Sequence, residues 1–345
     1  MSVHVIHELS LRNILLPKAP SDTGLQSTLH RVPGQVVGAL IGAGAQQDAS
    51  LADAKAAETP QVVPNGYGFC GEGHVIAALR LRCMILLMST TTSLQASALR
   101  VRVAVVTGAS RGIGREVAHE LARAHYAVVV NYGSRREDAE QVVAEIAAAG
   151  GAAVALCADV SDRVAVERMF EAVDARFGRL DALVNNAGVA QRIEAMTDIS
   201  DETWRRTLAV NLDGAFYCMR AAIGRLKAAG GGRIVNISSG AARTGGSVGA
   251  HYAASKAGLL ALTTRAAREL ARDGISVNAV LPSLIETAML GAVVPTAEGR
   301  ERLRAQLPMG RFGRADEVAR VVRFLVAEAP DYLTGELIAL HGARL

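Results

Sequence analysis

Residues 101–114 read VRVAVVTGASRGIG, an apolar and largely β-branched run followed by a glycine-rich turn. The run Val101–Val106 predicts a buried strand, and a helix is expected over Arg115–Ala124. A glycine-rich turn between a strand and a helix lets a pyrophosphate approach the backbone, and the first N–H groups of the helix stay free to bind it. This stretch therefore predicts the first unit of a dinucleotide-binding fold.

The alternation of strand and helix continues to the end of the chain. Further strands are expected at Ala127–Val130, Ala153–Leu156, Ala182–Val184, Arg233–Ile237, Ser276–Val280 and Leu337–Leu340. Further helices are expected at Asp138–Ala149, Arg163–Phe177, Asp201–Lys227, Tyr252–Arg272 and Ala315–Val326. Apolar strands joined by helices of this length are typical of parallel sheets that are covered on both faces. We predict an α/β fold, a doubly wound parallel sheet of the Rossmann type with about seven strands.

Residues 1–87 have a different composition. They carry five of the nine prolines and equal numbers of acidic and basic residues, and they show no sustained helix or strand period. We expect a poorly structured N-terminal extension, which is flexible, or binds a partner, or is translated from a start codon assigned too early. Met88 is the alternative start, and residues 88–345 are expected to form one Rossmann-type domain. No basic region followed by an apolar run marks a secretory signal.

Composition excludes several classes of protein. The chain is 50% hydrophobic and 20% charged, which suits a packed core. No run reaches the roughly 18 apolar residues of a membrane span. The 37 basic residues are dispersed among 33 acidic ones and aromatic residues make up 4%, so no nucleic-acid surface is expected. The four cysteines are far apart and no ligand cluster has metal-binding spacing, which predicts no metal and a reducing cytoplasm.

The residues after the second strand bear on the choice of cofactor. Sites that prefer NAD usually place an acidic residue here for the ribose hydroxyls, but residues 131–135 read NYGSR. Arg111 in the glycine turn, together with Ser134 and Arg135, is suited to a 2′-phosphate. We therefore predict NADP(H), with NAD as the less favoured cofactor. The alternative is that Arg135 and Arg136 only begin a solvated helix.

Three later segments carry the chemistry. Asn185-Asn186-Ala187-Gly188 follows the fourth strand, Ser238-Ser239 follows the fifth, and Tyr252 and Lys256 stand four apart on the next helix. An ammonium close to a phenol favours the phenolate, so Lys256 is expected to lower the pKa of Tyr252 toward working pH. A phenol tuned in this way can exchange a proton with a carbinol oxygen.

Together these motifs resemble the short-chain dehydrogenase/reductase family, in the branch of the 3-oxoacyl-carrier-protein reductases. The resemblance covers residues 101–342 and rests on the motifs above with Val210-Asn211-Leu212 and Val277-Asn278-Ala279-Val280. It implies four catalytic residues. Tyr252 would donate the proton, Lys256 would hold the nicotinamide ribose and tune Tyr252, and Ser239 would bind the carbonyl oxygen. Asn211 would anchor a water that links Lys256 to solvent.

Two of these assignments have alternatives. Ser238 is the other candidate for the polar partner, but Ser239 stands thirteen residues before Tyr252, the spacing of the family. Asn211 is alternatively a capping or packing residue within its helix. The neighbouring His251 and the distant His341 receive no catalytic role; His251 is expected to be structural or to face the substrate, and His341 to be structural.

The resemblance also implies a set of cofactor-binding residues. Asp159 would contact the adenine, or alternatively only end the third strand, and Ile285 and Thr287 would meet the nicotinamide carboxamide. The full set is Thr107, Gly108, Ser110, Arg111, Gly112, Ile113, Gly114, Asn131, Ser134, Arg135, Asp159, Val160, Asn186, Ala187, Gly188, Tyr252, Lys256, Pro282, Ile285 and Thr287.

The chain departs from the family pattern at three places. Ser283 follows Pro282 where the family usually has glycine, and His341 replaces the first glycine of a terminal Gly-Gly turn. Residues 228–232 are not basic, which weakens the case for an acidic carrier-protein substrate. The long connection Ser283–Phe312 is expected to form a substrate lid. Its apolar residues, which either line the pocket or only pack the lid, are Met289, Leu290, Val293 and Val294.

The expected activity is that of an NADPH-dependent carbonyl reductase, reversible as an alcohol dehydrogenase. Its substrate would be a small carbonyl or alcohol, either a 3-oxoacyl compound or another small hydrophobic ketone. One alternative is a sugar or polyol dehydrogenase on the same scaffold. Another is a protein that senses NADP without turnover. The resemblance further suggests a homotetramer built on the helices Asp201–Lys227 and Tyr252–Arg272.

Overall fold

The computed structural model describes residues 101–343 of the chain. The predictions for residues 1–87 lie outside this part. The described residues contain one seven-stranded sheet in the order β3-β2-β1-β4-β5-β6-β7, and every neighbouring pair is parallel. The strands are β1 (Arg102–Val106), β2 (Tyr126–Tyr132), β3 (Ala152–Cys157), β4 (Ala182–Asn185), β5 (Gly232–Ile237), β6 (Ile275–Pro282) and β7 (Leu337–Leu340). The predicted doubly wound parallel sheet is confirmed.

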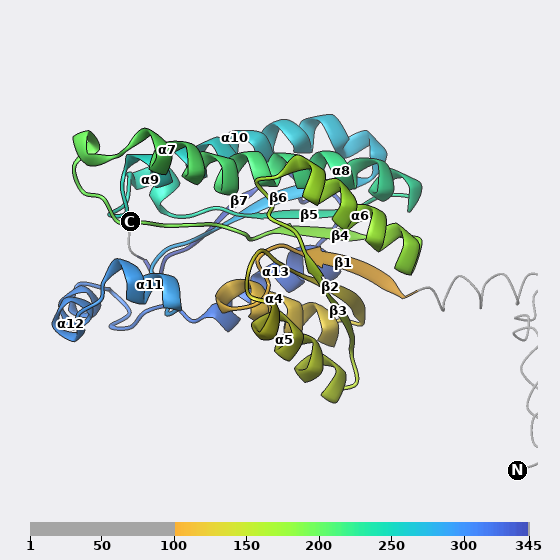
Figure 1. Ribbon diagram of the computed structural model, residues 1–345, viewed down its shortest axis with the longest axis horizontal. Helices are drawn as coiled ribbons and strands as arrows, with labels where there is room; N and C mark the ends of the chain where they lie inside the picture. The colour runs from red at the N-terminus through yellow and green to blue at the C-terminus, as the bar shows by residue number, and fades with distance from the viewer. Residues whose placement is uncertain (1–100, 344–345) are drawn as a thin grey trace, which may run out of the picture. The chain divides into compact units, whose positions relative to one another are not determined.

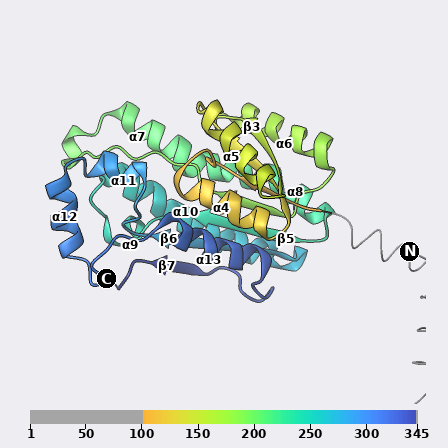
Figure 2. The same ribbon diagram turned by 90° about the horizontal axis from the view of Figure 1, so that it is seen from below.

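Helices cover both faces of this sheet (Figure 1). One layer contains α6 (Arg163–Phe177), α7 (Asp201–Leu208), α8 (Gly214–Ala228) and α10 (Ala250–Leu270). The opposite layer contains α4 (Gly112–Arg123), α5 (Arg136–Ala148) and α13 (Ala315–Ala327), which face the viewer in Figure 2. Three shorter helices, α9 (Ala241–Thr244), α11 (Ala288–Val293) and α12 (Ala297–Ala305), lie at one end of the sheet.

Alternation along the strands divides the core into two clusters. In β1, Val103 and Val105 pack with α6, α8 and α10, whereas Ala104 and Val106 pack with α4, α5 and α13. Both sets are at most 1% exposed. A strand buried on both faces needs apolar residues at every position, which is why β1 reads as a continuous apolar run.

One predicted helix is interrupted. The segment expected as a single helix over Asp201–Lys227 consists of α7, a π-helical turn η2 (Ala209–Asp213), and α8. A π turn inserts one residue into the helical repeat and is found mostly at functional sites. Here the turn contains Asn211, whose side chain bonds a neighbouring loop.

The site follows from the strand order. The chain runs outward from β1 to β3 on one side and from β4 to β7 on the other, so the crossover helices leave on opposite faces between β1 and β4. Ligands of open α/β sheets bind outside the carboxyl ends of the strands at this point. The carboxyl ends of β1, β2, β4, β5 and β6 lead into the glycine turn and residues 131–135, 185–188, 238–239 and 282–287, which were predicted as site segments.

Candidate active site

A cavity of about 790 Å³ lies at the carboxyl edge of the sheet. It runs from the glycine turn and the ends of β2 and β3, past the end of β5 and the start of α10, to the segment that contains α11. The predicted site residues on its wall are Gly108, Ser110, Arg111, Gly112, Ile113, Asn131, Ser134, Arg135, Asp159, Val160, Asn186, Ala187, Gly188, Ser239, Tyr252, Lys256, Pro282, Ile285 and Thr287. Three predicted residues do not line it: Thr107, Gly114 and Asn211.

The glycine turn is tight enough to exclude side chains. Gly108 and Gly112 have φ of 60° and 57°, in the left-handed region that favours glycine. A Cβ at Gly108 would lie 2.9 Å from the Cα of Ala187. The turn therefore packs directly on the segment after β4 and presents backbone N–H groups at the start of α4.

Hydrogen bonds of Thr107, which lies behind the cavity wall, and of Asn186, which lines it, hold this packing together. The Thr107 hydroxyl accepts hydrogen bonds from the backbone N–H of Asn186 at 2.9 Å and of Ala187 at 3.0 Å. The Nδ2 of Asn186 donates to the carbonyls of Thr107 and Gly108 at 2.9 and 3.0 Å. A Cβ at Gly114 would lie 2.4 Å from that nitrogen. Thr107 and Gly114 thus shape the cofactor turn without facing the cavity.

The part of the cavity wall next to Asp159 contains a charged network that the sequence did not reveal. Asp159 accepts from the backbone N–H and the hydroxyl of Ser161, at 3.0 and 2.7 Å, and pairs with Arg206 of α7 at 3.1 Å. Burial alone would raise the pKa of Asp159, but these partners outweigh it and hold the pKa below its usual value. Arg206 lines the cavity, yet nothing in its local sequence distinguishes it from other surface arginines.

The side chain of Asn131, at the end of β2, makes its hydrogen bonds to the protein backbone. Its Oδ1 accepts from the backbone N–H of Gly108 at 3.2 Å, and its Nδ2 donates to the carbonyl of Ala158 at 3.1 Å. The side chain therefore ties the glycine turn to β2 and to the segment after β3. Its amide has little capacity left for a cofactor, although the residue lies on the cavity wall.

No acidic residue from the end of β2 lines the cavity. Its wall there consists of residues 131–135, and Arg111 stands opposite at the N-terminus of α4. Arg135 pairs with Asp138 at 3.3 Å, but both side chains are about half-exposed, and Arg111 has no carboxylate partner within residues 101–343. This end of the cavity therefore suits an anionic group on the ribose.

Tyr252 and Ser239 meet on the cavity wall. Tyr252, in the first turn of α10, is 8% exposed. Burial raises the pKa of its phenol, and the adjacent Ser239 hydroxyl partly opposes this by stabilising the phenolate. Ser238 instead donates to the backbone carbonyl of Lys256 at 2.8 Å. Of the two serines, the structure therefore places Ser239 beside the phenol.

Lys256 lies one helical turn below Tyr252 and is 4% exposed. Its Nζ donates to the carbonyl of Ile237 at 2.9 Å and stands 5.9 Å from the centroid of the Tyr252 ring. Burial lowers the pKa of Lys256 to about 8. The prediction that Lys256 lowers the pKa of Tyr252 is wrong for this structure, because burial has the larger effect on the phenol and Lys256 is not among the groups that shift it.

Asn211 faces the loop after β4. Its Oδ1 accepts from the backbone N–H of Val189 at 2.8 Å, and its Nδ2 donates to the carbonyl of Val189 at 3.0 Å and to the hydroxyl of Ser255 at 3.1 Å. The side-chain amide is thus committed to protein partners. It positions Gly188, where a Cβ would lie 3.3 Å from this Oδ1 and 3.5 Å from the Nζ of Lys256.

His251 supports the same loop. The imidazole is fully buried and does not line the cavity. Its Nε2 lies 3.1 Å from the carbonyl of Gln191, and the Nδ1 is buried without a hydrogen-bond partner among residues 101–343. Because a carbonyl only accepts, Nε2 carries the proton in this contact. Of the two roles expected for His251, the structure supports the structural one.

The segment after β6 forms another part of the cavity wall. The carbonyl of Pro282 accepts from the backbone N–H of Gly240 at 2.9 Å, and Ile285 forms a parallel bridge with Gly313. The Cγ2 of Thr287 lies 3.7 Å from the position of a Cβ on Gly112. Thr287 therefore brings this segment against the glycine turn, across the width of the cavity.

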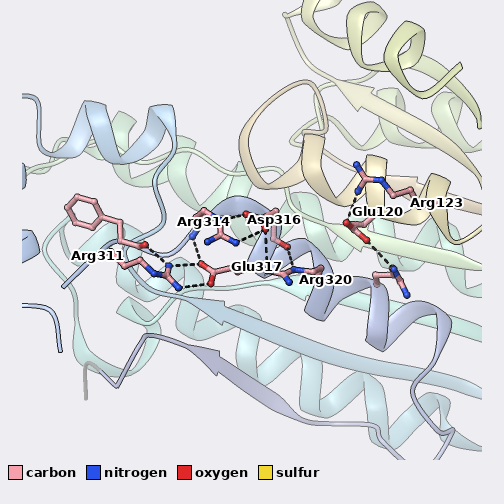
Figure 3. Close-up of polar contacts among 9 residues, drawn as sticks. Glu120, Arg123, Arg311, Arg314, Asp316, Glu317 and Arg320 are labelled. Carbon is pink, nitrogen blue, oxygen red and sulfur yellow. Dashed lines mark hydrogen bonds and ion pairs between the residues drawn. The ribbon is translucent and has the colours of Figure 1, made fainter. Parts of the chain in front are cut away.

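The predicted lid contains α11 and α12. Met289, Leu290 and Val293 line the cavity, which is one of the two roles expected for the apolar residues of the lid. Val294 instead packs inside the segment near Gly299, the other expected role. The far end of the segment is tied to α13 by Arg311, whose two NH groups donate to Glu317 at 2.8 Å each (Figure 3). Arg311 and the backbone N–H of Arg314 hold the pKa of Glu317 at about 2.

The charges on the cavity wall are mostly positive. Asp159 is the one carboxylate among its lining residues, and it is paired. The cations are Arg111, Arg135, Arg206, Arg243 and Lys256. Within residues 101–343, no cluster of His, Cys, Asp or Glu has the geometry of a metal site. The helices of this part of the chain are too short or too polar to cross a membrane.

Comparison with known proteins agrees with this geometry. A family model described as enoyl-(acyl carrier protein) reductase matches residues 108–342. The chain is 41% identical to 3-oxoacyl-(acyl-carrier-protein) reductase FabG of Staphylococcus aureus (strain Mu50) over 239 residues, 69% of this chain and 96% of the relative. It is 39% identical to L-rhamnose 1-dehydrogenase (NAD(P)(+)) of Azotobacter vinelandii over 245 residues, 70% and 95% of the two chains.

A solved structure is also similar. A variant of actinorhodin polyketide ketoreductase, crystallised with NADPH, superposes with a TM-score of 0.67 at 34% identity, covering 70% of this chain and 96% of that one. The family model spans the glycine turn from Gly108 onward, the strands β2 to β7 and the positions of Ser239, Tyr252 and Lys256.

Proposed function

Because the chain belongs to the short-chain dehydrogenase/reductase family of NAD(P)-dependent oxidoreductases, we propose that it is an NADPH-dependent carbonyl reductase that also runs in reverse as an alcohol dehydrogenase. The preferred substrate is a 3-oxoacyl compound or another small hydrophobic ketone. The observation that carries the proposal is the Tyr252 phenol on the cavity wall with the Ser239 hydroxyl beside it.

The preference for NADPH rests on Arg111, Ser134 and Arg135 on the cavity wall, with no acidic residue from the end of β2 among them. The residues present fit a dinucleotide, since Gly108 and Gly112 adopt the left-handed backbone that leaves room for a pyrophosphate. Arg111 and Arg135 would hold the 2′-phosphate. Thr287, Ile285 and Pro282 would enclose the nicotinamide end, and Asp159 the adenine end.

The protein supplies orientation and a proton. NADPH, when bound, supplies the hydride. The Ser239 hydroxyl donates a hydrogen bond to the substrate carbonyl oxygen and fixes it beside Tyr252. The Tyr252 phenol then gives its proton to the same oxygen as negative charge develops there. A raised pKa keeps this phenol protonated at neutral pH, which suits the direction of reduction.

Lys256 returns the proton and orients the cofactor ribose. Its pKa of about 8 lets the ammonium release a proton near neutral pH. The water link through Asn211 stays a prediction. The bonds of its side chain to Val189 and Ser255 support a second role. We propose that Asn211 also positions the loop of Gly188 and Val189 against Lys256, so that it acts on the reaction through Lys256.

A sugar or polyol dehydrogenase is the second candidate. The similarity to the L-rhamnose dehydrogenase, 39% against 41% for the reductase FabG, favours it almost equally. A protein that only senses NADP is a weaker alternative, because Ser239, Tyr252 and Lys256 all reach the cavity.

The activity is tested by following NADPH and NADH consumption with a 3-oxoacyl thioester and a simple diketone, and NADP⁺ reduction with an aldose. We expect Tyr252→Phe to lower kcat by about 10² to 10⁴ because it removes the transferred proton. Tyr217→Phe, which removes a phenol from α8 outside the cavity, is the matched control and should leave kcat unchanged. Tight NADPH binding without turnover of any substrate would contradict the proposal and favour the sensor.

The same assays address the N-terminal part. All residues on the cavity wall lie between Gly108 and His341, so a chain beginning at Met88 should keep the kcat and KM of the full chain. We also propose a cytoplasmic location, supported by the unpaired state of Cys157 and Cys218 among the described residues. A homotetramer that uses α8 and α10 remains our proposal for the assembly.

A further inference from the structure

Ser283 and His341 stand side by side at the substrate end of the cavity. They follow β6 and β7, whose last register pair is Pro282 with Leu340. The backbone N–H of Ser283 donates to the carbonyl of Leu340 at 2.9 Å. Both side chains line the cavity. They therefore form one corner of its wall, at the carboxyl edge of the sheet next to β5.

The Ser283 hydroxyl is adjacent to the catalytic serine segment. A Cβ at Gly240, the residue after Ser239, would lie 3.7 Å from both the Cβ and the Oγ of Ser283. The backbone of Gly240 is fixed in this place by its hydrogen bond to Pro282. The backbone φ of Ser283 is not in the left-handed region, and its hydroxyl makes no hydrogen bond within residues 101–343. A side chain is therefore tolerated here, and its hydroxyl is available to a ligand.

His341 presents a second uncommitted group. Its Nδ1 is buried without a hydrogen-bond partner in the described part of the chain. The ring borders both the large cavity and a smaller one of about 160 Å³ under the end of the lid. This nitrogen is closed to solvent, so it does not itself meet a ligand in the cavity. The Nε2, which makes no hydrogen bond within residues 101–343, is the ring nitrogen left for a ligand on the cavity wall.

The opposite wall has a different character. Met289, Leu290 and Val293 of α11 are apolar, and the carboxylate of Asp159 belongs to the adenine end. A serine hydroxyl and an imidazole can each donate or accept a hydrogen bond. The corner therefore suits an uncharged oxygen, either a carbonyl or a hydroxyl, on a substrate whose remaining surface is apolar or faces solvent.

We propose that Ser283 and His341 form a subsite for a second substrate oxygen. The subsite selects carbonyl compounds that carry another carbonyl or hydroxyl oxygen a few bonds from the reacting one. This inference rests on the proposed reductase function and specifies its substrate class. A simple ketone would place hydrocarbon against both polar groups and leave them desolvated and unpaired, and a site of this kind discriminates strongly against the analogue that lacks the oxygen.

The test compares matched substrates in the full chain. The substrates are an acetoacetyl thioester, 2,4-hexanedione, its single-ketone analogue 2-hexanone, and an aldose oxidised with NADP⁺. The variants are Ser283→Ala and His341→Leu, which remove the polar atoms, and Ser283→Thr, which keeps the hydroxyl. We expect Ser283→Ala and His341→Leu each to lower kcat/KM about tenfold for the substrates with a second oxygen and less than about twofold for 2-hexanone.

The readouts separate the alternatives. If the two variants lower kcat/KM only for the thioester and the diketone, the second oxygen is a carbonyl. If they lower kcat/KM only for the aldose, it is a hydroxyl. Either result supports the subsite. Ser283→Thr should retain most of the native kcat/KM. An equal loss for 2-hexanone, a raised KM for NADPH, or unchanged kcat/KM for every substrate would overturn the subsite. Absence of turnover by the native chain itself would instead overturn the proposed function.

Discussion

Lys256 carries an ammonium group into a place from which water is nearly excluded. Its side chain has one hydrogen bond, to the carbonyl of Ile237, and no carboxylate partner within residues 101–343. The charged form is therefore destabilised relative to the unfolded chain, and the pKa falls from 10.5 to about 8. The fold thus accommodates the lysine of the proposed mechanism at a cost in stability.

This cost predicts a pH dependence of folding. Between about pH 8 and 10.5 the unfolded chain holds the Lys256 proton while the folded chain has lost it, so the free energy of unfolding rises with pH across this window. Below about pH 8 both states are protonated and the full penalty remains. We expect Lys256→Met to remove this rise, as measured by urea unfolding at several pH values.

Lys227 provides the matched control for that experiment. Its side chain is 46% exposed and pairs with Asp273 at 2.8 Å on the protein surface. Lys227→Met should keep the rise seen in the native chain, since Lys256 is still present. An identical pH slope in native protein and Lys256→Met would show that burial of Lys256 does not depress its pKa.

At the scale of the element, the N-terminus of α4 is the most tightly specified part of the fold. Gly114 stands in the first turn of the helix, where Asn186 and the Gly108 carbonyl approach its Cα. The helix can reach the sheet only because this residue has no side chain. The same contact fixes the turn that faces the cavity, so the packing of α4 and the shape of the proposed cofactor turn depend on one residue.

Two helical glycines give opposite predictions. A Cβ at Gly114 would lie 2.4 Å from the Nδ2 of Asn186 and 2.5 Å from the carbonyl oxygen of Gly108, so Gly114→Ala should destabilise the protein and raise the KM for NADPH. A Cβ at Gly224 in α8 meets nothing within 4 Å, so Gly224→Ala should stabilise by about 0.5 to 1 kcal/mol through the lower entropy of the unfolded chain. Thermal unfolding and cofactor titration of both variants measure the contrast. Equal effects would contradict it.

At the scale of the whole molecule, α8 presents an aromatic surface on the outside of its layer. Phe216 is 43% exposed, and the Arg220 guanidinium stacks on the rings of Phe216 and Tyr217 at 5.2 and 5.5 Å. Exposed aromatic and arginine side chains are enriched at protein interfaces. This surface supports the proposed tetramer built on α8 and α10.

The assembly is tested by its mass. Sedimentation equilibrium should give four times the chain mass of 36.1 kDa for the native protein and a smaller species for Phe216→Glu, because a carboxylate cannot be buried unpaired in the interface. Val164→Glu is the matched control, since Val164 is 44% exposed on α6, outside the two proposed helices. A tetramer in both variants would exclude α8 from the interface.

The sequence predicted the strands, their parallel pairing and part of the cavity wall, because the strands depend on local patterns and those wall residues lie in short motifs. The apolar runs of β1 to β6 and the glycine turn at 107–114 are readable from neighbours alone. It predicted a continuous helix over Asp201–Lys227, where the structure has the π turn, because helical periodicity carries no information about one inserted residue. Arg206 was missed, since its pairing with Asp159 joins residues 47 positions apart.

By itself, therefore, the sequence determined the fold, the family and the group of residues from which the chemistry is drawn. Only the tertiary structure decided their environments. The pKa of Tyr252 is raised and not lowered, the Asn211 side chain bonds Val189 and Ser255, and Ser283 stands beside His341 at the edge of the sheet. Periodicity and motif spacing reflect only contacts between residues that are close in the sequence. Desolvation and hydrogen-bond commitment depend on segments that folding brings together, so they exist only in the folded chain.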